Sequence, residues 1–125
     1  MMHAEEIRQY CIAKPAVTES FPFDESTLVF KVMNKMFALL SLEKFEQGSG
    51  SINLKCDPAW AEELRGEHPD DILPGYHMNK KHWNTVEVNG GLAPKFIIEL
   101  IDHSYELIVK SLPKKMKQQL ENGDY

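Results

Sequence analysis

The residues best suited to chemistry lie in one stretch, Gly75–Thr85, with the sequence GYHMNKKHWNT. It combines lysines, histidines, asparagines and aromatic residues at a predicted turn between two short strands. Lysines at the tip of such a turn can contact nucleic-acid phosphates, while asparagines and aromatic rings can contact a base or a sugar. In the alternative interpretation, Trp83 anchors the hydrophobic core, and Lys80 and Lys81 are ordinary solvated turn residues. Residue spacing alone favours this alternative.

Metal-binding and nucleophilic motifs are missing from the sequence. It has five histidines and two cysteines but neither a Cys-x-x-Cys nor a His-Glu-x-x-His motif. His77 and His82 could meet across a turn, but two ligands do not make a zinc site. Cys11 lies on the apolar side of a predicted helix, and no base is tied to Cys56, which precedes a helix. The sequence therefore predicts no catalytic residue, no metal and no cofactor.

The formal net charge of −5 is unevenly distributed along the chain. Residues 48–76 have two basic and six acidic side chains, a net charge of −4, whereas residues 77–118 have seven basic and four acidic ones, a net charge of +3. A net negative protein repels a polyanion at long range, which argues against non-specific nucleic-acid binding. The positive stretch includes Lys80 and Lys81, so nucleic-acid binding would be confined to one face.

Length and composition indicate one globular domain. The chain has 125 residues, 42% of them hydrophobic and 26% charged, which is close to average globular usage. Its longest uninterrupted apolar run, Met36–Leu40, is far shorter than the ~20 residues of a membrane-spanning helix. The first residues resemble no secretory signal, and two cysteines suit a reducing compartment. We therefore expect a cytoplasmic protein without membrane contact.

Apolar periodicity and turn residues predict an α+β domain with the order α-β-β-β-α-β-β-α. The predicted helices are Glu5–Ala13, a helix that begins at Pro58, and Lys95–Leu112. The predicted strands are Leu28–Met33, Met36–Leu42, Ser51–Cys56, Tyr76–Met78 and His82–Val88. Two-residue and three-residue turns at Asn34-Lys35 and Asn79–Lys81 make these strands an antiparallel sheet.

Several segments resemble the MmcQ/YjbR family of small bacterial proteins. They are Tyr10–Pro15, Asn53–Pro58, His77–Val86, Leu100–Tyr105 and Ser111–Pro113. The resemblance covers essentially the whole chain, and the His-x-Asn-Lys-x-His-Trp segment is its most specific part. It implies a single domain over residues 1–125, with residues 114–125 a polar tail or a short helix. It also implies a CyaY-like or secretion-chaperone-like fold, in which helices pack on one side of an antiparallel sheet.

Members of this family are often labelled DNA-binding because of a "double wing" arrangement, which is an argument from fold. The resemblance supplies no catalytic residues and draws attention to Asn79, Lys80, His82 and Trp83. Together with the chemistry above, it gives these DNA-binding candidates: His77, Asn79, Lys80, Lys81, His82, Trp83 and Asn84.

The leading hypothesis is a non-enzymatic DNA-binding protein that contacts phosphates through the Asn79–Trp83 hairpin. The alternative is a protein-interaction or chaperone-like module that uses an apolar surface, and the acidic net charge suits this module better. A small-ligand site around His82 is a third possibility. The sequence leaves open whether the protein is a monomer or a homodimer.

Overall fold

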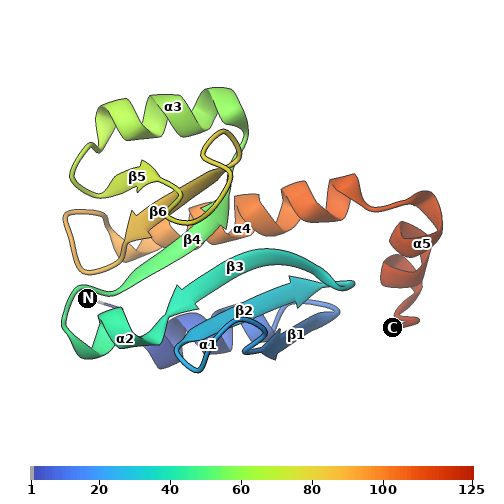
Figure 1. Ribbon diagram of the computed structural model, residues 1–125. Coiled ribbons are helices and arrows are strands. Elements are labelled where there is room, and N and C mark those ends of the chain that lie inside the picture. Colours follow the sequence, from blue (N-terminus) through green and yellow to red (C-terminus); the bar gives the residue numbers. More distant parts are fainter. Residues whose placement is uncertain (1) are drawn as a thin grey trace.

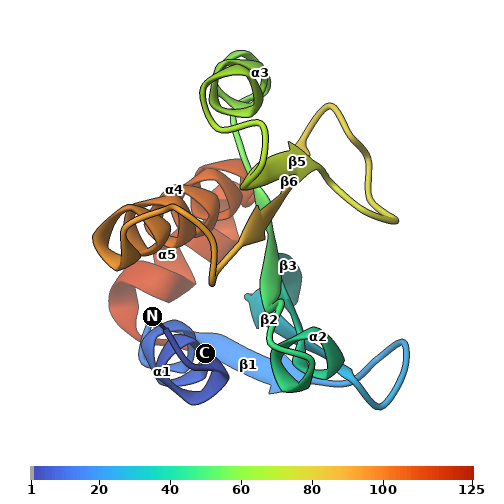
Figure 2. The ribbon, with the colours of Figure 1, turned by 90° about the vertical axis from the view of Figure 1, so that its left-hand side faces the viewer.

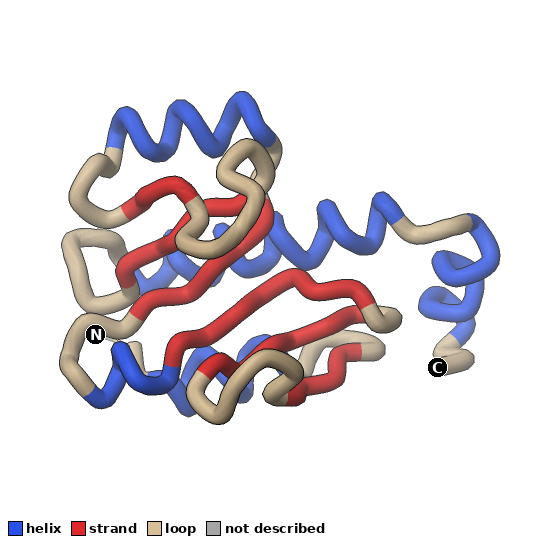
Figure 3. Tube along the Cα trace, viewed as in Figure 1, coloured by secondary structure: helices blue, strands red, loops and turns tan. Residues whose placement is uncertain are grey.

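The computed structural model describes residues 2–125 and contains five helices and six strands in this part of the chain (Figure 1; Figure 3). The helices are α1 (Ala4–Ile12), α2 (Leu42–Glu46), α3 (Pro58–Glu67), α4 (Pro94–Ser111) and α5 (Lys114–Asn122). The strands are β1 (Val17–Ser20), β2 (Thr27–Val32), β3 (Lys35–Ser41), β4 (Ser51–Lys55), β5 (Ile72–Pro74) and β6 (Trp83–Glu87).

The six strands form one antiparallel sheet in the order β1-β2-β3-β4-β6-β5. Helices α1 and α4 lie on one side of this sheet, and α3 lies beyond its β5–β6 edge (Figure 2). The connections 21–26 and 75–82 project on the opposite side (Figure 2). The predicted α+β fold, with helices on one side of an antiparallel sheet, is therefore confirmed.

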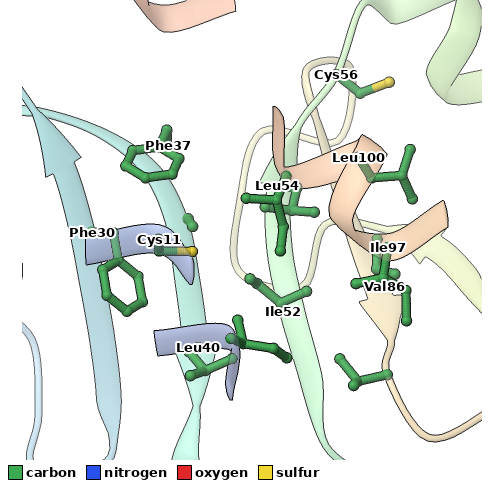
Figure 4. Close-up of a cluster of buried hydrophobic side chains, with 14 of the residues drawn as sticks. Cys11, Phe30, Phe37, Leu40, Ile52, Leu54, Cys56, Val86, Ile97 and Leu100 are labelled. Carbon is green, nitrogen blue, oxygen red and sulfur yellow. The ribbon is translucent and has the colours of Figure 1, made fainter. Parts of the chain in front are cut away.

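The main hydrophobic core fills the space between the sheet and the helices. Inward-facing strand residues such as Phe30, Leu40 and Ile52 belong to the same buried cluster as Ile97 and Leu100 of α4 (Figure 4). The alternating side-chain directions of a strand leave the other residues of each strand on the opposite face. There, Val29, Leu39 and Trp83 form a second, smaller cluster, against which Met36 and Met78 pack. We call this side of the sheet the open face.

Prolines mark the starts of α3 and α4, and an aspartate caps α3, as the sequence predicts. The Asp57 carboxylate accepts a hydrogen bond of 3.1 Å from the Trp60 backbone N–H, and Pro58 occupies the first position of α3. Pro94 also occupies the first turn of α4, which has no side-chain cap, and Pro113 separates α4 from α5. The C-terminal segment is thus a short helix rather than a tail.

Four local predictions were wrong in detail. Strand β1 and helix α2 were not predicted, and α2 begins at Leu42, which was assigned to a strand. The strand that pairs with β6 is Ile72–Pro74, not Tyr76–Met78. The tight turn between β2 and β3 uses Met33 and Asn34, both with positive φ, so that Lys35 already belongs to β3. A turn with two left-handed residues has the twist that adjacent strands require.

Two further observations concern the helices and the cysteines. Across residues 2–125, no helix combines the length and apolar character required to cross a bilayer. Cys11 and Cys56 are both free and buried.

Candidate nucleic-acid interface

The Gly75–His82 loop, which joins β5 to β6, is folded by its own backbone. The Gly75 N–H donates to the Trp83 carbonyl at 2.9 Å, and the Trp83 N–H donates to the Asn79 carbonyl at 3.0 Å. A side chain at Gly75 would place its Cβ 2.8 Å from the Cβ of Trp83, so the loop start requires glycine. A hairpin joins β5 to β6, but its first strand is Ile72–Pro74 rather than the predicted Tyr76–Met78, so its connection is longer than the three-residue turn that the sequence indicated.

Two of the seven candidate residues are buried and therefore not available to a ligand on the surface. Trp83 is 9% exposed and packs in the second cluster, and Asn84 is 2% exposed. The Asn84 side-chain oxygen accepts a hydrogen bond of 2.7 Å from Nε of Arg65. Trp83 thus anchors an apolar cluster, as the alternative interpretation expected, and Asn84 links the sheet to α3 through Arg65.

The other five candidates lie in the loop itself. Asn79 fixes the tip, because its side-chain oxygen accepts from the Lys81 N–H at 3.0 Å. Lys80 and Lys81 are exposed, and the Lys80 ammonium also donates to the Gly75 carbonyl at 3.1 Å. His77 has a φ of 60° and lies on the Tyr76 ring, with 4.0 Å between ring centroids. His82 is half-buried, and its carbonyl accepts from the Cys56 N–H at 2.8 Å.

Arg65 of α3 completes this surface and was not predicted from the sequence. Its guanidinium donates to the backbone carbonyls of Lys80 and Trp83 as well as to Asn84, so it holds the loop against α3. A hollow of about 410 Å³ lies between α3 and the loop, and Arg65, Lys80 and Lys81 line it together with Glu62. Three cationic side chains thus face one carboxylate. We call this the α3–loop hollow.

Two more lysines lie on the adjacent part of the open face. Lys55 of β4 is the register partner of Trp83, and Lys31 of β2 is the partner of Met36, which packs against the Trp83 cluster. Neither lysine belongs to an ion pair within residues 2–125. Lys31 and Lys55 thus lie beside the apolar cluster, whereas Arg65, Lys80 and Lys81 line the neighbouring α3–loop hollow.

The cysteines are poor candidates for nucleophiles. Burial raises the pKa of the Cys11 thiol to about 12 and that of Cys56 to about 11, so both are protonated at neutral pH.

His103 has a structural role, because its Nε2 accepts a hydrogen bond from the Asp57 N–H at 3.1 Å. Within residues 2–125, no group of three or more His, Cys, Asp or Glu side chains has the arrangement of a metal site.

Other segments that carry the family resemblance meet in the fold. Lys14, which follows α1, places its ammonium 2.6 Å from the Asp102 carboxylate of α4. The Tyr10 hydroxyl donates to the same carboxylate oxygen at 2.6 Å, and the Tyr105 hydroxyl donates to the Pro15 carbonyl at 2.7 Å. These contacts join α1 to α4, so several of the residues behind the resemblance stabilise the fold.

Comparison with known proteins identifies relatives along nearly the whole chain. A family model described as YjbR matches residues 12–107. The uncharacterised protein YjbR of Escherichia coli K12 is 36% identical over 119 residues, which cover 95% of this chain and 98% of that protein. The uncharacterised protein YbdF of Escherichia coli O157:H7 is 34% identical over 119 residues, 95% of this chain and 94% of that protein.

Solved structures agree with this assignment. The crystal structure of protein DR2400 of Deinococcus radiodurans superposes with a TM-score of 0.87 at 40% identity and covers 97% of this chain and 89% of that chain. A crystal structure of a protein from Pseudomonas syringae has a TM-score of 0.69 at 30% identity and covers 85% of this chain and 98% of that chain. From the family model, the relatives and the shared fold, we conclude that this chain belongs to the YjbR family.

Proposed function

We propose that this protein is a non-enzymatic, cytoplasmic DNA-binding protein whose phosphate contacts centre on the α3–loop hollow. The observation that carries the proposal is the gathering of Arg65, Lys80 and Lys81 around this hollow against one carboxylate, Glu62. Cationic side chains that surround a surface depression are the usual means of contacting a phosphate backbone. The proposal keeps the predicted lysines and adds an arginine from α3.

The neighbouring lysines extend this surface. Lys31 and Lys55 lie on the open face beside the Trp83 cluster, so a strand that crosses the hollow would meet further cations on the sheet. The acidic groups of the open face lie mainly around the opposite end of β3, where Glu43 follows the strand. The net charge of −5 therefore does not prevent local attraction of a polyanion, although it reduces attraction at long range.

Binding of a fluorescent DNA duplex, measured by anisotropy between about 50 and 200 mM salt, tests the proposal. The logarithm of the binding constant should fall linearly with the logarithm of the salt concentration. Because each phosphate contact contributes about 0.9 to this slope, Lys80→Ala combined with Lys81→Ala should reduce its magnitude by about 2. Absence of binding at the lowest salt concentration would refute the proposal.

A matched control separates specific contacts from loss of charge. Lys81 and Lys95 are both exposed lysines, but Lys95 lies in the first turn of α4, on the helix-covered side of the sheet. Lys81→Ala should therefore weaken binding and reduce the slope, whereas Lys95→Ala should change neither. Equal effects of the two substitutions would show that only the total charge matters and that the α3–loop hollow is not the binding site.

A protein-interaction module is the second candidate, and exposed aromatic residues favour it. Phe21, Phe23 and Tyr76 are 48, 64 and 61% exposed, and the last two line the same cavity on the open face. Exposed apolar side chains in one region are typical of protein-binding surfaces. Light scattering coupled to size-exclusion chromatography tests this candidate for self-association, because a dimer formed through this region should dissociate in Phe23→Ser.

A further inference from the structure

The open face carries a cavity of about 670 Å³ that shares no lining residue with the α3–loop hollow. Its floor consists of short polar side chains from four adjacent strands. The register pairs Thr27 with Ser41, Leu39 with Asn53 and Asn53 with Thr85, which places these residues side by side. Apart from Leu39, the floor is polar and uncharged. Thr85 and Asn53 are engaged with each other and with the Tyr76 backbone, which leaves Asn53 its second amide hydrogen, and Ser41 and Ser51 contribute hydroxyl groups.

Two largely exposed aromatic rings, Phe23 and Tyr76, line this cavity. They belong to the connections that project from the open face, 21–26 and 75–82 (Figure 2). A ring that remains mostly in water gains little from the hydrophobic effect, so its own burial does not explain its position. Hydrogen bonds of the two connections hold these rings at the cavity instead.

Polar contacts with the cavity floor hold Tyr76 in place. The Tyr76 N–H donates to Oγ1 of Thr85 at 2.9 Å, and the Tyr76 carbonyl accepts from Nδ2 of Asn53 at 3.3 Å. Oγ1 of Thr85 in turn donates to Oδ1 of Asn53 at 2.6 Å. The His77 ring lies against one side of Tyr76, and the Lys44 ammonium lies 5.4 Å from the Tyr76 ring centroid. The hydrogen bonds thus fix the backbone of Tyr76, and His77 and Lys44 flank its ring.

The loop of Phe23 is fixed by a carboxylate. Asp24 accepts hydrogen bonds from the backbone N–H groups of Ser26 and Thr27, at 2.9 and 2.7 Å, and these bonds lower the pKa of Asp24. Asp24 and Glu43 line the cavity with one cation, Lys44, so its charge does not attract phosphate. Aromatic walls over a neutral polar floor suit a flat ring with hydrogen-bonding groups on its edge.

We propose that this cavity binds an unpaired nucleobase, which stacks on Tyr76 or Phe23 and directs its polar edge toward the floor. The assignment rests on the proposed DNA-binding function, since it makes the base part of a strand whose phosphates lie at the basic residues of the same face. A free nucleoside presents the same ring, so the experiment must distinguish the two sources.

Binding of the intact protein to a single-stranded oligonucleotide and to an abasic strand of equal length tests the proposal. Both strands have the same phosphates, but only one has bases. The base-containing strand should bind about 5- to 100-fold more tightly, in keeping with one or a few stacked bases. Tyr76→Ala and Phe23→Ala should remove most of this difference. The control Tyr125→Ala changes an equally exposed ring outside the cavity and should preserve the difference.

Saturation-transfer NMR with free thymidine and adenosine provides the second arm. Transfer that disappears in Tyr76→Ala, without binding of any strand, would support the cavity as a nucleobase site, identify free nucleosides as its ligands and refute the DNA-binding function. Equal binding of normal and abasic strands, with no transfer to nucleosides, would overturn the nucleobase site, even if the salt-dependent binding of duplex DNA is observed.

Discussion

Among single residues, Lys14 has the least exposed side chain of all residues that form ion pairs within residues 2–125. Its side chain is 17% exposed, and its ammonium lies 2.6 Å from Asp102 and about 5 Å from the ring centroids of Tyr10 and Tyr105. Asp102 also accepts the Tyr10 hydroxyl, and burial together with this hydrogen bond raises the pKa of Tyr10 to about 12. The Asp102 carboxylate thus pairs with the partly buried Lys14 ammonium and also holds the Tyr10 hydroxyl.

We therefore expect Asp102→Ala to destabilise the protein by about 1–2 kcal/mol, because it leaves a partly buried ammonium and a hydroxyl without their acceptor. Urea unfolding measures this loss. The matched control is Glu5→Ala, which breaks the exposed pair between Glu5 and Arg8 and should change the unfolding midpoint little. Equal shifts for the two variants would contradict the special position of Asp102.

His103 makes a residue-level prediction about pH. Burial lowers the pKa of His103, and Nε2 can accept the Asp57 N–H only when it is unprotonated. The unfolded chain therefore binds a proton at this site more readily than the folded protein does. The stability contributed by neutral His103 is fully present above the ordinary histidine pKa of about 6.5, and it is lost as the pH falls from there through the lower pKa of the folded protein.

The measurement is the free energy of unfolding of wild type and His103→Gln as a function of pH. Their difference isolates the site from other titrating groups, including Glu87, whose pKa burial raises and whose effect runs in the opposite direction. The wild type should lose more stability than the variant below about pH 6.5. Parallel curves would show that His103 does not titrate differently in the two states.

At the scale of elements, two glycines differ in the space around them. Gly50 lies close to α2, whereas Gly66 lies within α3 and has open space beside it. A Cβ at Gly50 would lie 2.4 to 2.7 Å from atoms of the Phe45 ring of α2, so Gly50 allows β4 to start directly beneath α2. A Cβ at Gly66, within α3, would have no heavy atom within 4 Å. The same substitution should therefore have opposite effects.

We expect Gly50→Ala to destabilise the protein by about 1–3 kcal/mol, because the Phe45 ring must move. Gly66→Ala should be neutral or stabilise it by up to about 1 kcal/mol, because alanine favours the helix. Thermal unfolding of both variants checks the pair. Similar destabilisation by both would contradict the contact between Gly50 and Phe45 as the cause.

The sequence predicted long elements better than short ones. Helix α4 and the strands β2, β3 and β4 have enough apolar positions to define a period, and α3 has an acidic cap followed by proline. Strand β1 has four residues with only one apolar position, Val17, and its place depends on pairing with β2. The segment 72–74 pairs through its backbone and includes a proline, so no pattern identified it.

At the scale of the whole molecule, only part of the candidate site could be predicted. Lys80 and Lys81 are adjacent in a turn, and sequence reasoning found them. Arg65 lies on another element, and its place beside them depends on how α3 packs against the loop. The floor of the open-face cavity comes from four strands, and residues such as Ser51 and Asn53 carry no signal until the register aligns them.

Helix α5 permits a test of how much of the molecule the fold requires. None of its residues is fully buried, and the family model ends at residue 107, before α5 begins. Its lysines Lys114, Lys115 and Lys117 form a second basic group along the chain. A chain that ends at Pro113 should therefore retain cooperative unfolding with a similar slope in urea, because that slope depends on the surface buried in the core.

The same truncation tests whether the second basic group belongs to the proposed interface. The hollow between α3 and the loop involves no residue of α5, so the truncated chain should bind duplex DNA with nearly the full-length salt slope. Combining the truncation with Lys80→Ala and Lys81→Ala should give the slope of the double variant alone. A truncation that reduces the slope by about 3 would mean that all three α5 lysines contact phosphates and that the interface extends to the C-terminal helix.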